Sequence, residues 1–217
     1  MKFFIVFFIV IIQVSCSPTL WNLRKESPNE IGAIAESSQR LAKVITSKIN
    51  KQGPHKKILE VGAGTGVFTE KIVQKLGSND HVDVVELIPE LCGILQEKFG
   101  SNPQVTIFCG DVLTWSPDYS YDYIVSGLPF NSFPPALITK ITDLYAKQIK
   151  PGGIVSFFEY KFLPSIRKFF MNSQDAKKYT EVRTVIENFI KKYSFEEESV
   201  YLNLPPAVVY FLQINTN

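Results

Sequence analysis

Short apolar runs alternate with amphipathic segments along most of this chain, and this alternation limits the folds open to it. Strand-like runs occur at residues 57–61, 81–87, 104–111, 121–127 and 152–160. Between several of them apolar residues recur at helical spacing, which predicts helices at 67–77, 89–100 and 134–150. Strands joined through helices of this length imply right-handed crossovers, and therefore a Rossmann-like, doubly wound, parallel α/β sheet.

The two ends of this alternating region complete the predicted domain, which we take as residues 23–217. A helix is expected at 37–49, ahead of the first strand. Two further strands are expected in "FEEESVYLNLPPAVVYFLQI", close enough in sequence to pair antiparallel at an edge of the sheet. A chain of 217 residues with 45% hydrophobic content can bury one good core.

Residues 1–22 form a hydrophobic leader, beginning "MKFFIVFFIVIIQVSCSP". Its unbroken apolar run, Phe3 to Ile12, has the usual length of a signal-peptide core. However, no charged residue occurs from Phe3 to Asn22, which is about the length of a membrane-spanning helix. Both a signal peptide and a membrane anchor stay open, and both predict that the protein is membrane-associated.

Several classes of function have little support in the composition. A net charge of +2 does not by itself indicate nucleic-acid binding. Cys16, Cys92 and Cys109 show no paired spacing, so neither a disulfide framework nor a metal site is predicted. His55 and His81 lie in polar surroundings, which leaves zinc or Ser-His-Asp chemistry without a basis.

A glycine-rich turn, "EVGAGTG", follows the first strand and includes Gly62, Gly64 and Gly66. Glycines in such a turn permit positive φ and let the backbone approach a ligand closely. The spacing is G-x-G-x-G, so it matches neither the dinucleotide fingerprint nor a P-loop. We therefore expect the turn to hold a nucleoside with a short charged tail.

Acidic residues occur where three successive strands end. Glu60 lies in the end of the first strand, Glu86 ends the second, and Asp111 follows the third. Any one of them could be a helix cap. Together they indicate one crevice at the carboxyl edge of the sheet, where Glu86 could accept both ribose hydroxyls and Asp111 an adenine amine.

With these motifs, "LEVGAGTG", "VVELIPEL", "CGDV" and "SGLPF", the chain resembles the class I S-adenosylmethionine-dependent methyltransferases. The resemblance implies a seven-stranded, mostly parallel sheet with the C-terminal antiparallel hairpin. It also implies that Glu60 and the glycine turn hold the methionine part of the cofactor, Glu86 the ribose, and Asp111 the adenine. The full set of expected cofactor-binding residues is Glu60, Gly62, Ala63, Gly64, Gly66, Glu86, Leu87, Asp111, Val112 and Ser126.

Within that superfamily, "IGAIAESSQRLAK", "VSGLPFNSFPP" and "YLNLPPAVVYFLQ" are similar to segments of bacterial phospholipid N-methyltransferases, which methylate phosphatidylethanolamine. Amino-directed methyltransferases carry a short proline turn after the fourth strand. The backbone carbonyls of this turn can accept hydrogen bonds from the amine, and its aromatic ring can stabilise a developing cation. The resemblance assigns that catalytic turn to Gly127, Leu128, Pro129 and Phe130. Gly127 replaces the Asn or Asp usual in nucleic-acid amino-methylases, which favours an aliphatic amine.

No general base stands out, and Asn131, Glu159 and Tyr160 are candidates by location only. Basic and aromatic residues interleave between Lys161 and Arg183, a pattern that suits an anionic membrane surface or a solvated helix. Two alternatives to a lipid enzyme stay open: an rRNA or DNA adenine N-methyltransferase, and a non-catalytic, membrane-tethered cofactor-binding protein. Because S-adenosylmethionine is made in the cytosol, we expect a cytoplasmic catalytic domain, with export as the alternative.

Overall fold

The computed structural model describes residues 39–50, 55–161, 173–203 and 205–215 of the chain. The hydrophobic leader and much of the basic, aromatic stretch after Lys161 therefore lie outside the described residues. Within the described part, no helix is long and apolar enough to cross a membrane. No group of three or more His, Cys, Asp or Glu residues there could hold a metal ion.

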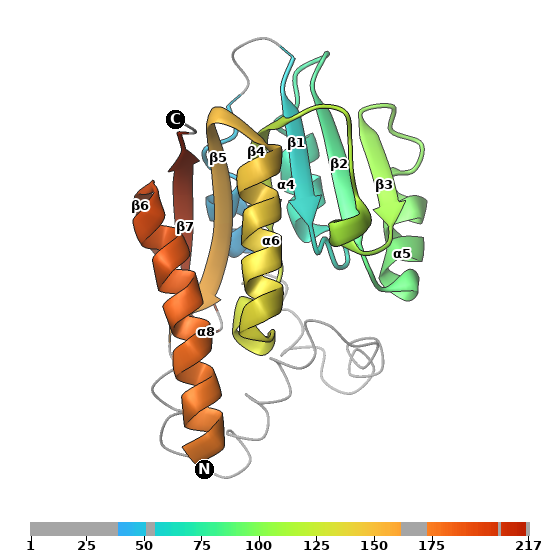
Figure 1. Ribbon diagram of the computed structural model, residues 1–217. Helices are drawn as coiled ribbons and strands as arrows, with labels where there is room; N and C mark the ends of the chain where they lie inside the picture. The colour runs from blue at the N-terminus through green and yellow to red at the C-terminus, as the bar shows by residue number, and fades with distance from the viewer. Residues whose placement is uncertain (1–38, 51–54, 162–172, 204, 216–217) are drawn as a thin grey trace.

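The described residues form a seven-stranded sheet with the strand order β3-β2-β1-β4-β5-β7-β6. The arrowheads of β1, β3 and β5 point to the lower edge in Figure 1, and that of β7 points up. The pairs among β1 to β5 are parallel, whereas β7 pairs antiparallel with both β5 and β6. The strands are β1 (Lys57–Val61), β2 (His81–Glu86), β3 (Val105–Cys109), β4 (Tyr121–Ser126), β5 (Ile149–Tyr160), β6 (Ser194–Val200) and β7 (Ala207–Ile214). The predicted fold class, including the terminal hairpin, is confirmed.

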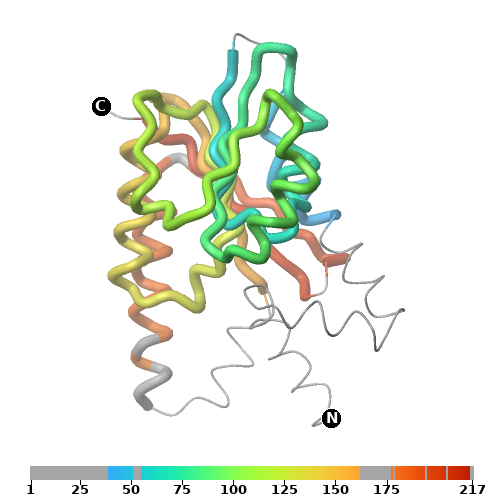
Figure 2. The backbone as a smooth tube through the Cα atoms, turned by 90° about the vertical axis from the view of Figure 1, so that its right-hand side faces the viewer, coloured from blue at the N-terminus to red at the C-terminus, as the bar shows by residue number. Residues whose placement is uncertain are grey.

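Helices cover both faces of the sheet, as Figures 1 and 2 show. One face carries α6 (Pro135–Gln148) and α8 (Ser173–Lys192), and the other carries α4 (Val67–Val73), α5 (Pro89–Phe99) and a short helix over residues 39–45. Proline at the first turn starts both α5 and α6, where its missing amide costs no hydrogen bond. Each layer of helices buries its own apolar cluster against the sheet.

The fifth strand begins earlier than predicted, at Ile149 instead of residue 152. Its register with β4 shifts between Tyr121 and Tyr123, so Ile149 pairs with Tyr121 before the main pairing starts at Ile154. The irregular stretch contains Gly152 at a φ of 78°, a left-handed conformation that glycine adopts without strain. Consequently α6 ends at Gln148 and is shorter than expected.

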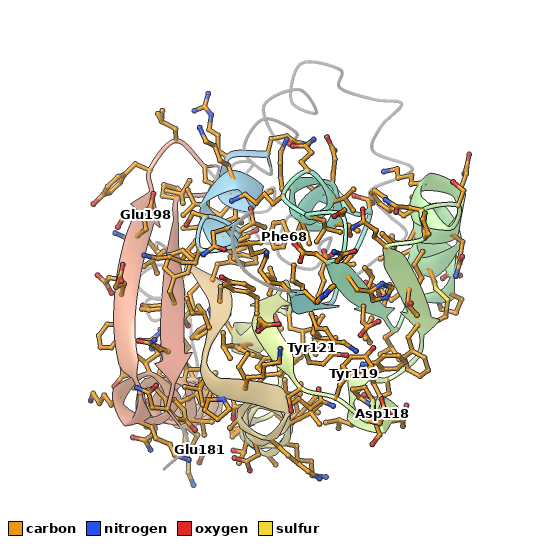
Figure 3. All side chains as sticks on the ribbon, turned by 90° about the horizontal axis from the view of Figure 1, so that it is seen from above. Phe68, Asp118, Tyr119, Tyr121, Glu181 and Glu198 are labelled. Carbon is orange, nitrogen blue, oxygen red and sulfur yellow. A yellow bond between two sulfur atoms is a disulfide. The ribbon has the colours of Figure 1, made fainter. Side chains whose placement is uncertain are left out.

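Asp83 lies in the middle of β2, and its buried carboxylate is held by two tyrosines from the chain entering β4. The hydroxyls of Tyr119 and Tyr121 donate to its Oδ2 at 2.6 and 2.7 Å. The two tyrosines lie next to each other in Figure 3, with ring centroids 5.6 Å apart. Trp115 extends the network by donating to the Tyr121 hydroxyl at 2.7 Å. These hydrogen bonds join β2 to the start of β4 and to the connection that precedes it.

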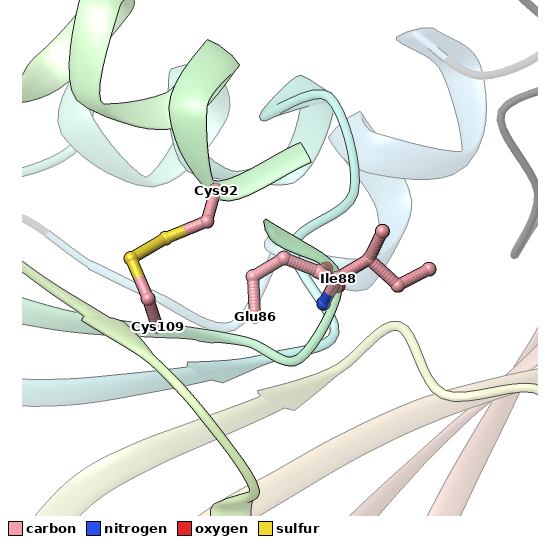
Figure 4. The surroundings of a disulfide bond; sticks show 4 residues. All are labelled: Glu86, Ile88, Cys92 and Cys109. Carbon is pink, nitrogen blue, oxygen red and sulfur yellow. A yellow bond between two sulfur atoms is a disulfide. The ribbon is translucent and has the colours of Figure 1, made fainter. Parts of the chain in front are cut away.

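Cys92 and Cys109 form a disulfide bond, so the prediction that the cysteines form no disulfide was wrong. Cys92 lies on α5 and Cys109 ends β3, 17 residues further along the chain. Because α5 folds back against β2 and β3, the two Cα atoms are 5.8 Å apart, within the usual range for a disulfide. Figure 4 shows the bond beside the loop that carries Glu86 and Ile88.

Candidate functional site

The glycine turn between β1 and α4 lies at the carboxyl edge of the sheet, and its glycines have positive φ, as predicted. Gly62, Gly64 and Gly66 have φ values of 72°, 59° and 86°. A Cβ on Gly62 would lie 2.7 Å from Cδ2 of Leu128, and one on Gly66 would lie 2.6 Å from the ring of Phe99. A Cβ on Gly64 would meet nothing within 4 Å. Glycine at positions 62 and 66 therefore leaves room for the side chains of Leu128 and Phe99, whereas Gly64 faces open space.

Glu86 connects the glycine turn to the loop that follows β2. Its Oε2 accepts a hydrogen bond from the Gly64 amide at 2.8 Å, and its Oε1 accepts one from the Ile88 amide at 2.9 Å. Each carboxylate oxygen has a second lone pair, so these bonds leave acceptor capacity for a ligand hydroxyl. Leu87, the next residue, is exposed at the rim of this loop.

Asp111 and Val112 lie after β3 at the same edge. Asp111 is exposed and caps the short 3₁₀ helix η1 (Val112–Thr114), where its Oδ1 accepts from the Leu113 amide at 2.9 Å. Asp111 is therefore a helix cap, which is the alternative role that the sequence left open for each of the three acids. Val112 is buried and packs into the core beneath the loop.

Glu60 is a buried acid with unsatisfied oxygens. Its side chain is 0% exposed, and neither carboxylate oxygen has a hydrogen-bond partner of good geometry. Burial raises the pKa of Glu60 to about 8, although the nearby hydroxyl and amide of Thr69 oppose the shift and Glu86 adds to it. Thr69, on α4, was not singled out from the sequence, and its own hydroxyl is also unpartnered. An acid of this kind is suited to receive a cationic or N–H-bearing group.

The turn after β4 packs directly on the glycine turn. The Gly127 amide donates to the Val61 carbonyl at 2.8 Å, and a Cβ on Gly127 would lie 2.5 Å from the Gly62 carbonyl oxygen. A side chain at position 127 therefore requires a backbone shift. Leu128 covers Gly62, and Ala63 lies buried beside it in the glycine turn. The turn that carries Pro129 thus adjoins the predicted cofactor crevice.

Two residues predicted at the site are buried in the protein's own packing. Ser126 is fully buried, and its Oγ accepts from the Tyr145 hydroxyl at 2.9 Å. Sequence patterns gave no signal for this Tyr145 contact, which joins α6 to the end of β4. The ring of Phe130 is 2% exposed and packs against Phe157 with centroids 5.5 Å apart, so it contributes to the core in this structure.

The three candidate bases have different surroundings. Glu159 is buried and both of its oxygens accept from Arg183 on α8, at 2.9 and 2.7 Å, so it acts as a structural partner of that helix. Tyr160 ends β5 opposite Ala207. Asn131, in the 3₁₀ helix η2 (Phe130–Ser132), has a buried Oδ1 without a hydrogen-bond partner. Of the three, Asn131 alone adjoins the proline turn and offers an unsatisfied acceptor.

Comparisons with known proteins agree with this geometry. A family model of ribosomal RNA adenine dimethylases matches residues 32–155. An ornithine lipid N-methyltransferase of Singulisphaera acidiphila is 26% identical, and the match covers 83% of this chain and 87% of that protein. A probable ribosomal RNA small subunit methyltransferase A of Methanococcoides burtonii is 25% identical over 69% of this chain, which spans 48% of that protein.

Solved structures show the same fold. The N-methyltransferase NodS from Bradyrhizobium japonicum WM9, in complex with S-adenosyl-L-homocysteine, superposes with a TM-score of 0.62 at 17% identity. The superposition covers 93% of this chain and 95% of that one. A methyltransferase from Klebsiella pneumoniae, described as an O-methyltransferase, gives a TM-score of 0.61 at 15% identity over 82% of this chain and 80% of that one.

Proposed function

Because this chain belongs to the ribosomal RNA adenine dimethylase family, and is therefore a class I S-adenosylmethionine-dependent methyltransferase, we propose that its methyl acceptor is the amine of a phosphatidylethanolamine-type phospholipid. The observation that carries the proposal is the breadth of the match to the ornithine lipid N-methyltransferase, which extends over 87% of that protein. The match to the ribosomal RNA relative from Methanococcoides burtonii, by comparison, extends over 48% of that protein.

The residues at the carboxyl edge fit S-adenosylmethionine. The unpartnered oxygens of Glu60 can accept from its ammonium, the open position beside Gly64 admits a ligand, and Glu86 retains lone pairs for ribose hydroxyls. We assign the adenine to the loop of Asp111 and Val112. When bound, the cofactor would supply an electrophilic methyl group: the N–C bond to the amine forms as the C–S bond breaks, and the sulfur leaves as the neutral thioether of S-adenosylhomocysteine.

The protein's own contribution to the reaction is mainly positioning. We propose that the carbonyls of Gly127 to Pro129 and the unsatisfied Oδ1 of Asn131 accept N–H groups of the substrate amine and aim its lone pair at the methyl group. An aliphatic amine needs only to lose a proton and to be aligned. An amide side chain at position 127, as used for adenine, would require the backbone shift described above.

Incubation with radiolabelled S-adenosylmethionine tests the proposal. Phosphatidylethanolamine vesicles, ribosomal RNA fragments and a mixture of both are offered to the full-length protein, and the products are separated by thin-layer chromatography and electrophoresis. We expect label in mono- and dimethylated lipid. Label in RNA but not in lipid would replace the proposal with the adenine N-methyltransferase alternative, which the family match supports.

Replacing Gly64 by alanine is expected to weaken cofactor binding at least about tenfold, because the new Cβ meets no protein atom and faces the open space assigned to the cofactor. The left-handed backbone at this position lowers the free energy of unfolding by about 1–2 kcal/mol for any non-glycine residue. Gly152→Ala is the matched control, since Gly152 has a φ of 78° and equally open surroundings but lies on β5 outside the site. Calorimetric titration with S-adenosylhomocysteine measures both variants. Equal affinities for the two would contradict the assignment of Gly64 to the crevice.

A further inference from the structure

Within the described part of the chain, the exposed large hydrophobic side chains are Leu87, Phe195, Tyr201 and Leu202. Leu87 belongs to the cofactor rim described above. Tyr201 and Leu202 are 71% and 74% exposed, and they are adjacent in the turn between β6 and β7. We call residues 201–203 and 205–206 the hairpin tip. Exposed apolar neighbours of this kind, in a chain with a well-filled core, point to a contact surface.

The hairpin tip is held in place by its own buried hydrogen bonds. Asn203 is 2% exposed, its amide donates to the Val200 carbonyl at 3.3 Å, and its Nδ2 donates to the Pro205 carbonyl at 2.6 Å. The Lys161 amide donates to the Pro206 carbonyl at 2.8 Å, which fastens the tip to the end of β5. Because Asn203 points inward and is fixed there, the two residues before it are displayed outward.

The strand pairing places the hairpin tip at the same edge of the sheet as the site. β7 is antiparallel to β5, and Ala207 at its start lies opposite Tyr160 at the end of β5. That end of β5 is the carboxyl edge, where the glycine turn and the turn after β4 also lie. Phe195, by contrast, pairs with Leu212 near the other end of the hairpin, at the opposite edge.

Positive charges accompany the exposed side chains of the hairpin tip. The Lys161 ammonium lies 4.7 Å from the centroid of the Tyr201 ring, and Arg40 Nη1 donates to the Leu202 carbonyl at 3.5 Å. Glu197 and Glu198 are exposed on β6 just before the tip, and Glu197 is close enough to interact electrostatically with the Tyr201 hydroxyl. An anionic surface would therefore attract the tip and repel the side of the strand, which favours end-on contact.

We propose that the hairpin tip is a docking element for an anionic phospholipid bilayer, with Tyr201 and Leu202 entering the headgroup region and Lys161 facing lipid phosphates. This inference rests on the proposed lipid substrate and gives that substrate a route to the site. Tyrosine suits such a position because its ring is apolar and its hydroxyl can stay hydrated. End-on contact would present the carboxyl edge of the sheet to the membrane surface.

Tryptophan scanning of the full-length protein tests the contact directly. Tyr201→Trp is expected to be quenched by vesicles of phosphatidylethanolamine and phosphatidylglycerol that carry brominated acyl chains, after subtraction of the wild-type signal. Phe195→Trp is the matched control, because Phe195 is also an exposed aromatic residue of β6 but lies at the opposite edge. Quenching of Tyr201→Trp alone supports the docking element. Equal quenching of both variants, or of neither, overturns it.

A rate measurement separates docking from the proposed function. Tyr201→Ala/Leu202→Ser should lower kcat/KM on vesicle lipid about tenfold, since the variant no longer moves the apolar surface of these two side chains from water into the headgroup region. The rate on a dispersed short-chain phosphatidylethanolamine should not change. Lipid methylation that is insensitive to the double variant would overturn docking but leave the lipid substrate intact. Absence of any lipid methylation by the wild type would instead refute the proposed function.

Discussion

Removal of the Cys92–Cys109 disulfide is expected to lower the free energy of unfolding by about 3 kcal/mol, the stabilisation typical of a cross-link that closes a loop of this size. The bond joins α5 to the end of β3 across a 17-residue separation, and Cys92 is buried. For a chain of this length, 3 kcal/mol corresponds to a fall in melting temperature of roughly 6–12 °C. Urea unfolding of Cys92→Ser/Cys109→Ser measures the change.

Cys16→Ser controls for the loss of a cysteine as such, because Cys16 takes no part in this bond. Adding a reductant to the wild type should reproduce the effect of the double variant, and it should change the double variant little. The slope of the unfolding free energy against urea concentration should be compared as well, since a cross-link makes the unfolded chain more compact and that slope depends on the surface exposed on unfolding. Identical unfolding midpoints with and without reductant would contradict a stabilising role.

The two half-cystines belong to segments that are hydrogen-bonded to the backbone at and just after Glu86, the last residue of β2. The Cys92 amide donates to the Ile88 carbonyl at 2.9 Å, and the Gly110 amide donates to the Glu86 carbonyl at 2.9 Å. The disulfide therefore links the two segments whose backbone amides hold Ile88 and Glu86, the proposed ribose-binding residue, in place (Figure 4). Disulfides persist mainly in oxidising compartments, whereas the methyl donor is made in the cytosol. A count of free thiols in protein taken directly from cells would show whether the bond forms there, and would thereby distinguish the cytoplasmic from the exported alternative.

The sequence predicted those features whose signal is local. Strand and helix positions followed from apolar periodicity, and the left-handed glycines followed from "GAGTG" because a strand-to-helix turn of that form needs positive φ. Residues at strand ends could be assigned to one edge because parallel strands all end there. These rules placed Gly62, Gly64, Glu86 and Asp111 at one edge without knowledge of any contact.

Features that depend on contacts between distant segments could not be predicted in this way. The disulfide required knowing how α5 returns to β3. The partner of Glu159 is Arg183, 24 residues away and on a different layer. Phe130 was expected to face the substrate, but its ring fills the core beside Phe157, where apolar burial stabilises the fold. The raised pKa of Glu60 results from the complete burial of its side chain, which no pattern of neighbouring residues in the sequence indicates.

The stability of the protein without added cofactor is expected to fall as pH rises because of Glu60. Its pKa is about 8 in the folded protein and near 4.5 in an unfolded chain, so the folded state binds more protons between these values. Stability from this residue is fully present below pH 4.5, decreases as pH rises towards 8, and then levels off. A shift of this size corresponds to a change on the order of 5 kcal/mol. Glu60→Gln should abolish this pH dependence, whereas Glu70→Gln, the same change at an exposed position on the neighbouring helix α4, should retain it.

Cofactor binding at pH 7 is expected to release close to one proton per molecule bound. Glu60 is mostly protonated at that pH, and a positive ammonium placed beside its unpartnered oxygens would stabilise the carboxylate and expel the proton. S-adenosylhomocysteine keeps the ammonium and lacks the sulfonium, so equal proton release with both ligands would assign the effect to the ammonium. Calorimetry in buffers of different ionisation enthalpy measures the proton count. Glu60→Gln should release none and bind about ten- to a hundredfold more weakly, since hydrogen bonds to a charged group contribute ~1.5–3 kcal/mol. A binding enthalpy that is the same in every buffer for the wild type would show that Glu60 does not receive the cofactor's charge.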